Sequence, residues 1–359
     1  MLSIFDSMMQ HKHEKVCLAT DSVSGLRAVI ALHNTVRGPA IGGVRLWQYD
    51  SEEAAILDAL RLSEAMTFKA AVADIPFGGG KAVILADGKE QEPGIRTARL
   101  RAFGRFVESL GGCYIAAPDV GTSPADMAQI KGVTGHVVCC PVELGGSGDP
   151  APMTAFGVLQ GMQALAEETL GVSSLVGVRV AIQGLGNVGM NLARLLIAEG
   201  AVVIGTDIRP EVVRQARMQL PIEVVVPEAI YDVPAAIFAP CALGGILNDR
   251  TIGRLSCQII AGSANNQLED DGHAELLRQR GIVYGVDYVL NAGGLINAAQ
   301  EFEGYDQQKA RQRVARIYDT VKRMLAISQA QQVSTLSAAH QIADSVLQRT
   351  YTTGASTRR

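Results

Sequence analysis

The sequence predicts an α/β protein with two domains, one of which contains a doubly wound parallel sheet. The chain has 359 residues, which favours two domains because domains average about 150 residues. Hydrophobic residues make up 48% of the chain and charged residues 19%, so there is enough apolar material for sizeable cores. Strand-like and helix-like segments alternate along the sequence, which is typical of layered α/β folds.

The first part of the chain contains the first set of these segments. Residues 26–32 predict a strand, and Ser51 predicts the N-cap of a helix that continues through residues 56–66. Glu52 and Glu53 in its first turn favour this helix, because carboxylates stabilise the positive end of the helix dipole.

Further along, the pattern continues towards a segment that interrupts it. A glycine-dense loop at 78–81 is predicted to lead into a short strand, and a helix around 95–110 precedes a strand at 113–117. Residues 141–153 contain three prolines and three glycines, which favours a linker there. The predicted boundaries are therefore a first domain at 1–140 and a second at 141–334.

The second part of the chain predicts a parallel sheet. A helix at about 154–169 is followed by short apolar strands that alternate with helical segments, as in doubly wound folds. The strands are expected at 178–183, 201–207, 235–240, 258–262 and 282–285. Two apolar stripes in the tail predict core-facing helices; the first consists of Val314, Ile317, Val321, Met324 and Leu325.

Composition excludes several classes of protein. The net charge of −4 and the pI near 5.9 disfavour nucleic acid as a partner. No signal peptide and no apolar run of membrane-spanning length is present, so we expect a cytoplasmic protein without a membrane partner. The six cysteines form no C-x-x-C pair and predict reduced thiols. His11 and His13 have no further ligands nearby, so no metal is predicted.

A glycine motif predicts a dinucleotide site. Gly184, Gly186 and Gly189 fit G-x-G-x-x-G, directly after a predicted strand and at the start of a predicted helix. Asn187 and Val188 complete the motif, and the helix start offers free N–H groups to phosphates. The segment therefore predicts a Rossmann-type domain.

The acidic residue after the next strand indicates which dinucleotide binds. Asp207 lies 18 residues after Gly189 and favours NAD over NADP, because a carboxylate accepts hydrogen bonds from ribose hydroxyls and repels a 2′-phosphate. Arg209, two residues on, weakens this preference. The alternative is an ordinary glycine turn in which Asp207 caps a helix.

Three charged residues in the first domain suit an amino-acid substrate. Lys69 and Lys81 are 12 residues apart, and Asp119 follows a predicted strand. A cation is needed for the substrate α-carboxylate, and a base near neutrality is needed for its ammonium group and for water. A desolvated lysine close to another cation has a lowered pKa and can serve as that base. Each residue alone is more often a solvated charge.

The whole chain resembles the glutamate/leucine/phenylalanine/valine dehydrogenases. The resemblance rests on motifs in family order: GPAIGGVR (38–45), YDSEEAA (49–55), MTFKAA (66–71), GGGKAVI (78–84), PDVGT (118–122), SGDPAPMTAFGV (147–158), QGLGNVG (183–189), IFAPCALGGILN (237–248), IAGSANNQL (260–268) and NAGGLIN (291–297). It implies an N-terminal α/β substrate domain, a Rossmann-type NAD-binding domain and an active-site cleft between them. It also implies that the C-terminal helix, 335–359, returns to the first domain, and that the chain forms a homo-oligomer, from dimer to octamer.

Roles for individual residues follow from the resemblance. Lys81 would be the catalytic lysine, Asp119 would exchange protons with the amino group, and Lys69 would hold the substrate carboxylate. Other residues would bind or surround the ligands. Gly42, Gly43, Met66, Leu295 and Ala298 would contact the substrate, and Thr154 and Asn291 would lie near the nicotinamide ring. Asn266, also predicted to bind the substrate, would help orient either its carboxylate or the nicotinamide.

The substrate side chain is left open by the sequence. Glutamate-type members have a lysine in the segment where this chain has Ile41-Gly42-Gly43, so a γ-carboxylate would lack its partner. Some motifs match leucine-acting members and others match phenylalanine- and tryptophan-acting ones. The predicted reaction is the reversible, NAD-dependent oxidative deamination of a bulky apolar L-amino acid to the 2-oxo acid and ammonia. The role of Glu143 is not predicted.

The sequence disfavours two other functions. A catalytically silent NAD-binding sensor or scaffold could use the same fold, although the presence of Lys69, Lys81 and Asp119 argues against it. A hydroxy-acid dehydrogenase would require a histidine as acid and base, and none of the six histidines lies in a matching context.

Overall fold

The computed structural model describes residues 3–356 and has the predicted α/β architecture. The chain forms two compact units. Among the described residues, unit 1 consists of 3–149, Ala298–Gln307 and 343–356, and unit 2 of Pro150–Asn297 and Gln308–Ile342. Whether these units are a substrate domain and a cofactor domain stays a prediction.

The boundaries of the units differ in detail from the predicted domain limits. The segment 141–149 belongs to unit 1, and the C-terminal helix begins in unit 2 and enters unit 1 at Ala343. Glu301 explains part of this division, because its Oε1 accepts hydrogen bonds from the backbone N–H groups of Cys139 (2.7 Å) and Ser147 (2.8 Å). Segment 298–307 thereby secures the loop that contains 141–149.

A five-stranded mixed sheet organises unit 1. Its order is β1-β2-β4-β3-β5, so β3 lies between β4 and β5 and runs parallel to both. β2 is antiparallel to β4 and to β1. The strands are β1 (Lys15–Asp21), β2 (Leu26–Asn34), β3 (Ala40–Trp47), β4 (Gly78–Leu85) and β5 (Tyr114–Pro118).

Helices cover both faces of this sheet. Helix α2 (Glu52–Val72) packs on one face, where Ala55 and Ala59 join Val83 in one core cluster. Ser51 caps this helix as predicted, since its hydroxyl accepts a hydrogen bond from the N–H of Ala54. The remaining elements of unit 1 are α1 (Ile4–Gln10), η1 (Lys89–Gln91), α3 (Pro93–Ser109), α4 (Pro124–Lys131), η2 (Val142–Leu144) and η4 (Gln300–Glu303).

The predicted glycine loop at 78–81 is wrong, because these residues are the first half of β4. A Cβ on Gly79 would lie 2.1 Å from the backbone nitrogen of Thr67 in α2, and a Cβ on Gly80 would lie 2.9 Å from the ring of Tyr114. The glycines thus allow close approach of α2 to one side of the strand and of an aromatic ring to the other.

Unit 2 contains a six-stranded sheet in the order β11-β10-β9-β6-β7-β8 with every pair parallel. β6 is the first strand of this sheet in the sequence and lies in its interior, with β7 and β8 on one side and β9, β10 and β11 on the other. This arrangement confirms the doubly wound prediction. The strands are β6 (Arg179–Gln183), β7 (Val202–Thr206), β8 (Glu223–Val224), β9 (Ile237–Pro240), β10 (Ile259–Ile260) and β11 (Val283–Tyr284).

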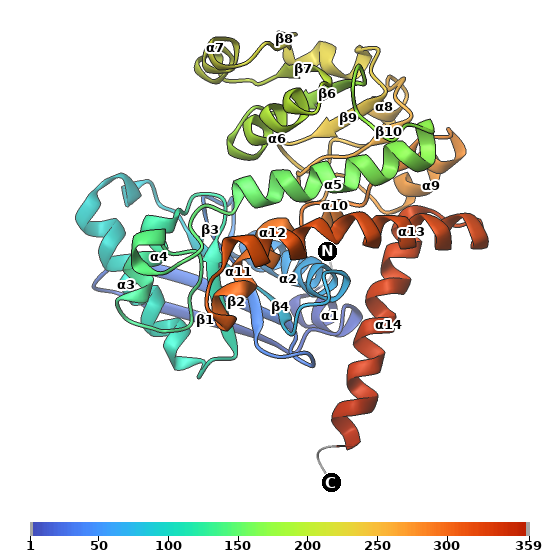
Figure 1. Ribbon diagram of the computed structural model, residues 1–359. Helices are drawn as coiled ribbons and strands as arrows, with labels where there is room; N and C mark the ends of the chain where they lie inside the picture. The colour runs from blue at the N-terminus through green and yellow to red at the C-terminus, as the bar shows by residue number, and fades with distance from the viewer. Residues whose placement is uncertain (1–2, 357–359) are drawn as a thin grey trace. The chain divides into compact units, whose positions relative to one another are not determined.

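The helices of unit 2 include two long ones, α5 and α13, which run side by side (Figure 1). The predicted apolar stripe of the tail is buried, with Val314 on α12 and the other four residues on α13. The helical elements are α5 (Ala151–Leu170), α6 (Asn187–Ala198), α7 (Pro210–Gln219), η3 (Pro227–Asp232), α8 (Asp249–Ile252), α9 (Gly272–Gln279), α10 (Asp287–Leu290), α11 (Gly293–Ala299), α12 (Gln307–Ala315), α13 (Ile317–Gln331) and α14 (Thr335–Ser356). Among residues 3–356, no helix is long and apolar enough to cross a membrane.

Candidate active site

A buried ion pair joins the two predicted catalytic residues. Lys81 on β4 places its Nζ 2.6 Å from Oδ2 of Asp119, which directly follows β5. The Lys81 side chain is 5% exposed and that of Asp119 15%. Thr122 fixes the loop, because its hydroxyl accepts a hydrogen bond from the N–H of Asp119 and donates one to the carbonyl of Val44. The structure therefore brings these two predicted residues together.

Glycine 43 lies between the two residues of this pair. The register of β3 with β4 places Gly43 level with Lys81, and the register with β5 pairs it with Ala117. A Cβ on Gly43 would lie 2.6 Å from Cβ of Asp119 and 3.0 Å from Nζ of Lys81. Lys81 can therefore reach Asp119 across β3 because the intervening residue has no side chain.

A second glycine of the same strand is packed on its other side. A Cβ on Gly42 would lie 1.7 Å from the carbonyl oxygen of Gly80, so no larger residue fits. The carbonyl of Gly42 accepts a hydrogen bond of 2.7 Å from the buried hydroxyl of Tyr114. Gly42 and Gly43, predicted to contact the substrate, thus also have packing roles within the sheet.

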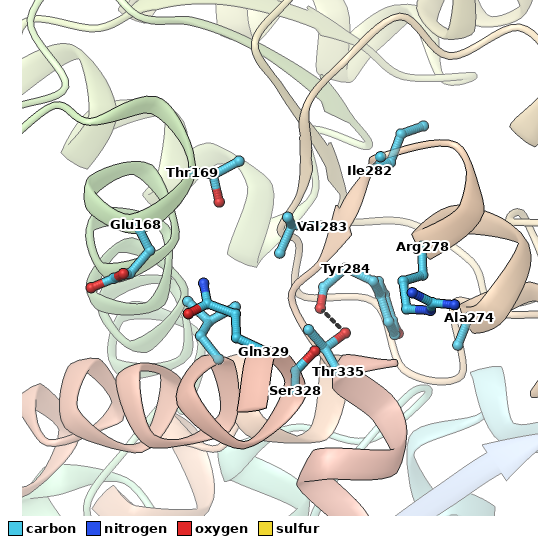
Figure 2. Close-up of a pocket in the computed structure, with 12 residues that line it drawn as sticks. Glu168, Thr169, Ala274, Arg278, Ile282, Val283, Tyr284, Ser328, Gln329 and Thr335 are labelled. Carbon is cyan, nitrogen blue, oxygen red and sulfur yellow. Dashed lines mark hydrogen bonds between the residues drawn. The ribbon is translucent and has the colours of Figure 1, made fainter. Parts of the chain in front are cut away.

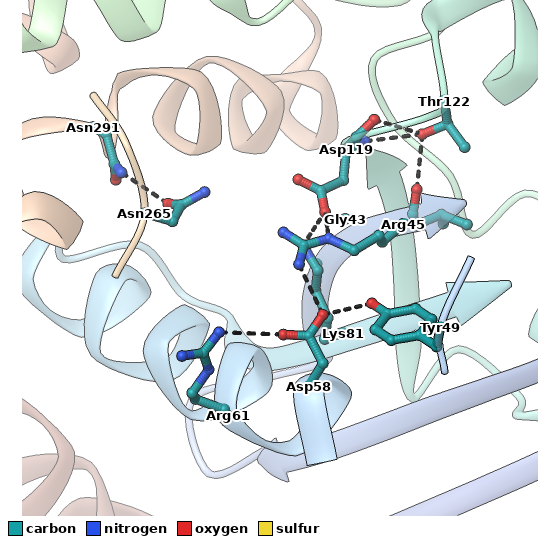
Figure 3. A network of polar contacts seen from close by, with 12 residues as sticks. Gly43, Arg45, Tyr49, Asp58, Arg61, Lys81, Asp119, Thr122, Asn265 and Asn291 are labelled. Carbon is teal, nitrogen blue, oxygen red and sulfur yellow. Dashed lines mark hydrogen bonds and ion pairs between the residues drawn. The ribbon is translucent and has the colours of Figure 1, made fainter. Parts of the chain in front are cut away.

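Arg45 extends the pair into a network (Figure 3). Its Nε donates to Oδ2 of Asp119 at 3.0 Å, and its Nη1 donates to Oδ2 of Asp58 on α2 at 2.8 Å. The hydroxyl of Tyr49 donates to the same Asp58 oxygen at 2.6 Å. Arg61 contacts the other oxygen of Asp58 at 3.4 Å.

The pKa values of the network follow from burial and charge. Burial lowers the pKa of the Lys81 ammonium, Asp119 opposes this effect, and Arg45 adds to it. Burial alone would raise the pKa of the Asp119 carboxyl, but Lys81 and Arg45 lower it to about 2. Asp119 is therefore ionised at neutral pH, whereas Lys81 is an ammonium that loses its proton more readily than an exposed lysine.

Two of the remaining predicted residues of unit 1 lie on α2. Lys69 is in its last turn and is buried, and Met66 is half-buried one turn earlier. Ala298, from the segment 298–307, is also buried. Glu143 is exposed on η2, outside the hydrogen-bonded network.

In unit 2, the predicted dinucleotide turn joins β6 to α6. Gly184 has φ +96°, and a Cβ on this residue would lie only 2.7 Å from Cβ of Ala242. A Cβ on Gly189 would lie 2.0 Å from the carbonyl of Gly184, so the third glycine allows the helix to begin close to the strand end. Gly186 is the N-cap, and no side chain caps this end of α6. Asn187 and Val188 form the first turn, so the shape of the turn suits a pyrophosphate.

Asp207 is tied to this turn. Its Oδ2 accepts a hydrogen bond from the N–H of Leu185 (3.0 Å), and its Oδ1 is 3.1 Å from Nε of Arg209. Burial would raise the pKa of the Asp207 carboxyl, but these donors lower it. The Arg209 guanidinium lies near Gly186, with Nη2 3.7 Å from the position of a Cβ there.

Asn291 has an unused acceptor. Its Nδ2 donates to the carbonyl of Ser263 (3.1 Å) and to Oδ1 of Asn265 (2.8 Å), as Figure 3 shows in part. Its own Oδ1 is buried and has no hydrogen-bond partner in the described part of the chain. A buried acceptor without a donor is costly, so it suits a ligand amide such as the nicotinamide carboxamide. The orphaned acceptor and the glycine turn both fit a nicotinamide dinucleotide.

Other predicted residues of unit 2 lie in adjoining loops and helix ends. Asn266 has φ +50° and its carbonyl accepts a hydrogen bond of 2.8 Å from the N–H of Gly245. Thr154 lies in the first turn of α5, where its Oγ1 would be 2.6 Å from a Cβ on Gly294. Leu295 is buried on α11.

A separate cavity of about 350 Å³ lies in unit 2 (Figure 2). It contains none of the predicted site residues. Several of its polar side chains are bound internally: Thr335 donates to the carbonyl of Tyr284 at 2.6 Å, and Ser328 donates to that of Val333 at 2.7 Å. We assign it no part in the reaction.

The sequence reasoning missed the residues that surround the ion pair. Arg45, Tyr49 and Asp58 received no role, although Arg45 and Tyr49 stand in quoted motifs. A signal was present: in a strand, residues two apart point to the same face, so Arg45 shares a face with Gly43. Within residues 3–356, no group of three or more His, Cys, Asp or Glu side chains could hold a metal, and the six cysteines carry free thiols.

Known proteins similar to this chain include three amino acid dehydrogenases. A leucine dehydrogenase of Geobacillus stearothermophilus is 47% identical over 96% of this chain and 93% of its own. A phenylalanine dehydrogenase of Caldalkalibacillus thermarum is 42% identical over 96% and 93%. The crystal structure of L-tryptophan dehydrogenase from Nostoc punctiforme superposes with a TM-score of 0.80 at 43% identity and covers 97% of this chain and 99% of that one.

Family models match most of the chain. Residues 8–136 match the dimerisation domain of the Glu/Leu/Phe/Val dehydrogenases. Residues 145–216 and 209–354 match the glutamate/leucine/phenylalanine/valine dehydrogenase model. Together with the identities above, these matches show that the chain is an amino acid dehydrogenase of the glutamate/leucine/phenylalanine/valine dehydrogenase family.

Proposed function

We propose that this chain catalyses the reversible, NAD-dependent oxidative deamination of an L-amino acid with a bulky apolar side chain. The reaction converts L-amino acid, water and NAD⁺ into 2-oxo acid, ammonium and NADH with release of a proton. The observation that carries the proposal is the 2.6 Å ion pair of buried Lys81 with Asp119, in a chain of this family.

The chain's own residues would move the protons. When bound, NAD⁺ supplies the acceptor for the hydride from the substrate Cα. Lys69 binds the substrate α-carboxylate, and Asp119 takes a proton from the substrate ammonium. Lys81, once neutral, removes a proton from the water that attacks the imino carbon, and its ammonium form then stabilises the developing oxyanion.

The buried position of Lys81 favours its role as a base. The pKa of its ammonium is lowered by desolvation and by Arg45, whereas Asp119 holds the proton in the resting site. When Asp119 takes up the proton of the substrate ammonium, its negative charge is neutralised, so Lys81 loses that support and releases its own proton more readily. A lysine tuned in this way can act as a base near neutral pH.

The proposed substrate class follows from the missing cation. The segment Ile41-Gly42-Gly43 has no charged residue, so a substrate γ-carboxylate would lack a partner there. The leucine, phenylalanine and tryptophan dehydrogenases named above share similar sequence identities with this chain, at 47%, 42% and 43%. An apolar pocket separates substrates that differ by a methylene by only about 1–3 kcal/mol, so the choice among them requires measurement.

We propose NAD as the preferred cofactor and a homo-oligomer as the assembly. Asp207 carries a negative charge at the end of β7, which opposes a 2′-phosphate. The match of residues 8–136 to a dimerisation domain supports self-association. Light scattering after size exclusion tests the assembly, and a monomer would contradict it.

A substrate panel tests the reaction. Absorbance at 340 nm is followed with L-Leu, L-Val, L-Phe, L-Trp and L-Glu, each with NAD⁺ and with NADP⁺. We expect turnover with at least one apolar substrate and a preference for NAD⁺. If no apolar substrate yields NADH, the proposal fails; cofactor binding without any turnover would instead indicate an NAD-binding sensor.

A pair of lysine variants separates catalysis from folding. Lys81→Ala should lower kcat by about 10²–10⁴-fold, the usual contribution of a general acid or base, while the Kd for NAD⁺ stays unchanged. The matched control is Lys89→Ala, because Lys89 is exposed on η1. Equal loss of catalysis and of cofactor binding in the Lys81 variant would indicate a folding defect.

A further inference from the structure

Arg45 occupies an unusual place, between the carboxylates of Asp119 and Asp58 (Figure 3). Its Nε donates a hydrogen bond of 3.0 Å to Asp119, and its Nη1 donates one of 2.8 Å to Asp58. Its side chain is 18% exposed, so both contacts are largely shielded from water. Arg45 is on β3 and Asp58 on α2, so the bridge links two elements of unit 1.

We propose that Arg45 is a positioning residue of the deamination reaction, which holds the Asp119 carboxylate against Lys81 and is itself fixed by Asp58 and Tyr49. This inference rests on the proposed function. Arg45 acts through Asp119 and Lys81, and we assign it no contact with substrate.

The first argument is geometric. Asp119 lies on a loop after β5, and Thr122 fixes its backbone rather than its carboxylate. The carboxylate oxygen Oδ2 receives Lys81 and Arg45 together. Arg45 in turn cannot turn away freely, because Asp58 holds its Nη1 and Tyr49 holds Asp58. This chain of contacts determines where Asp119 points.

The second argument concerns charge during the reaction. Lys81 must lose its proton to act as a base, and a buried carboxylate without a cation is strongly destabilised. Arginine stays protonated at all accessible pH values. Arg45 therefore keeps a positive charge beside Asp119 while Lys81 is neutral, and its charge also favours that neutral form.

The surroundings of Lys81 contain further titratable groups. Asp119 and Asp58 favour its ammonium form, and Arg45 opposes it. His33 on β2 faces α2, and its Nδ1 lies 2.8 Å from the hydroxyl oxygen of Thr67 on that helix. Arg61 and Tyr49 contact Asp58, and Lys69 lies further along α2. Removal of the Arg45 charge therefore leaves two carboxylates close to Lys81 without their shared cation.

Two substitutions separate the geometric effect from the effect of charge. Arg45→Gln removes both, so kcat should fall by about 10–100-fold, as for a misplaced catalytic group. The acidic limb of the kcat/KM profile should also move up by about one pH unit or more, because Lys81 loses a nearby cation. Arg45→Lys keeps the charge and loses the two-sided bridge, so kcat should fall while the limb stays near its wild-type pH.

The matched control is Arg61→Gln. Arg61 also contacts Asp58, at 3.4 Å, but it is 65% exposed in its side chain and lacks the contact with Asp119. We expect wild-type kcat and a wild-type pH profile. Thermal unfolding and NAD⁺ affinity are measured for every variant, and neither should change enough to explain the loss of rate.

A readout without turnover keeps this inference separate from the proposed reaction. Competitive acetylation of Lys81 by acetic anhydride, followed by peptide mass spectrometry across pH, reports the protonation of its amine. The midpoint should rise in Arg45→Gln and stay unchanged in Arg61→Gln, even if no substrate of the panel is turned over. Inactive wild-type protein with this shift would overturn the proposed reaction alone. An unshifted midpoint and pH profile, or a rate loss explained by unfolding, would overturn the role of Arg45.

Discussion

Gly43→Ala tests the crossing of Lys81 over β3 most directly. The added methyl would lie 2.6 Å from Cβ of Asp119 and 3.0 Å from Nζ of Lys81. Carbon atoms in contact are normally about 3.5–4.0 Å apart, so Asp119 must move away by about 1 Å. The Lys81–Asp119 contact of 2.6 Å and the Arg45–Asp119 contact of 3.0 Å cannot both persist after such a shift.

The expected magnitudes follow from this displacement. A misplacement of about 1 Å in a catalytic site costs about 10²-fold in rate, so kcat/KM should fall by about two orders of magnitude. Overpacking typically lowers the free energy of unfolding by about 1–3 kcal/mol. Gly43 and the dinucleotide turn belong to different compact units, so the Kd for NAD⁺ should stay unchanged.

The assay compares initial rates at 340 nm, urea unfolding and NAD⁺ titration for this variant and for Gly94→Ala. Gly94 is a suitable control because it lies in α3, has no atom within 4 Å of an added Cβ and has no left-handed φ. Folded Gly43→Ala protein with wild-type kcat/KM would refute the reasoning, since the Lys81–Asp119 geometry would then tolerate a methyl group.

Three further predictions concern the cofactor and stability. Asn291→Leu removes the orphaned Oδ1 acceptor and should weaken NAD⁺ binding about tenfold by calorimetry, as expected for one net hydrogen bond. Arg209→Gln removes the cation beside Asp207 and should raise the NAD⁺-over-NADP⁺ ratio of kcat/KM about tenfold. Burial lowers the pKa of His33 from 6.5 to about 4, so the unfolded chain binds a proton that the folded chain excludes. The free energy of unfolding should therefore decline as pH falls from 6.5 to 4, by about 3 kcal/mol from this residue, and His33→Gln should flatten the decline in urea titrations.

The fold of unit 2 was predictable because its signals are local. Five of the six strands lie in predicted apolar segments, whereas β8, which consists only of Glu223 and Val224, was missed. The glycines of the turn after β6 mark the position where a helix must start close to a strand end. The connection rules for parallel strands then restrict the possible orders of the sheet to a few. The partner of Asp207 was less predictable, since Arg209 could equally have pointed into solvent.

The sheet of unit 1 was only partly predictable from local patterns. β3 was not predicted, because Gly42 and Gly43 interrupt its apolar residues, and β1 was missed because its residues are mostly half-exposed or exposed. Without β3 there was no basis for placing Arg45 beside Asp119. The two residues are 74 positions apart in sequence, and only the pairing of β3 with β5 brings them together.

The glycines of this sheet have separate physical reasons, which composition alone could not distinguish. Gly79 allows α2 to approach the sheet, and Gly80 makes room for the ring of Tyr114 on the opposite face. Gly43 leaves a gap through which an ammonium group on one strand meets a carboxylate beyond the next. A side chain at position 43 would separate Lys81 from Asp119, the charged pair that Gly79 and Gly80 help to bury. The abundance of glycine in the chain, 38 of 359 residues, therefore contributes here to the electrostatics of Lys81, because close packing both excludes water from its amine and brings Asp119 within reach.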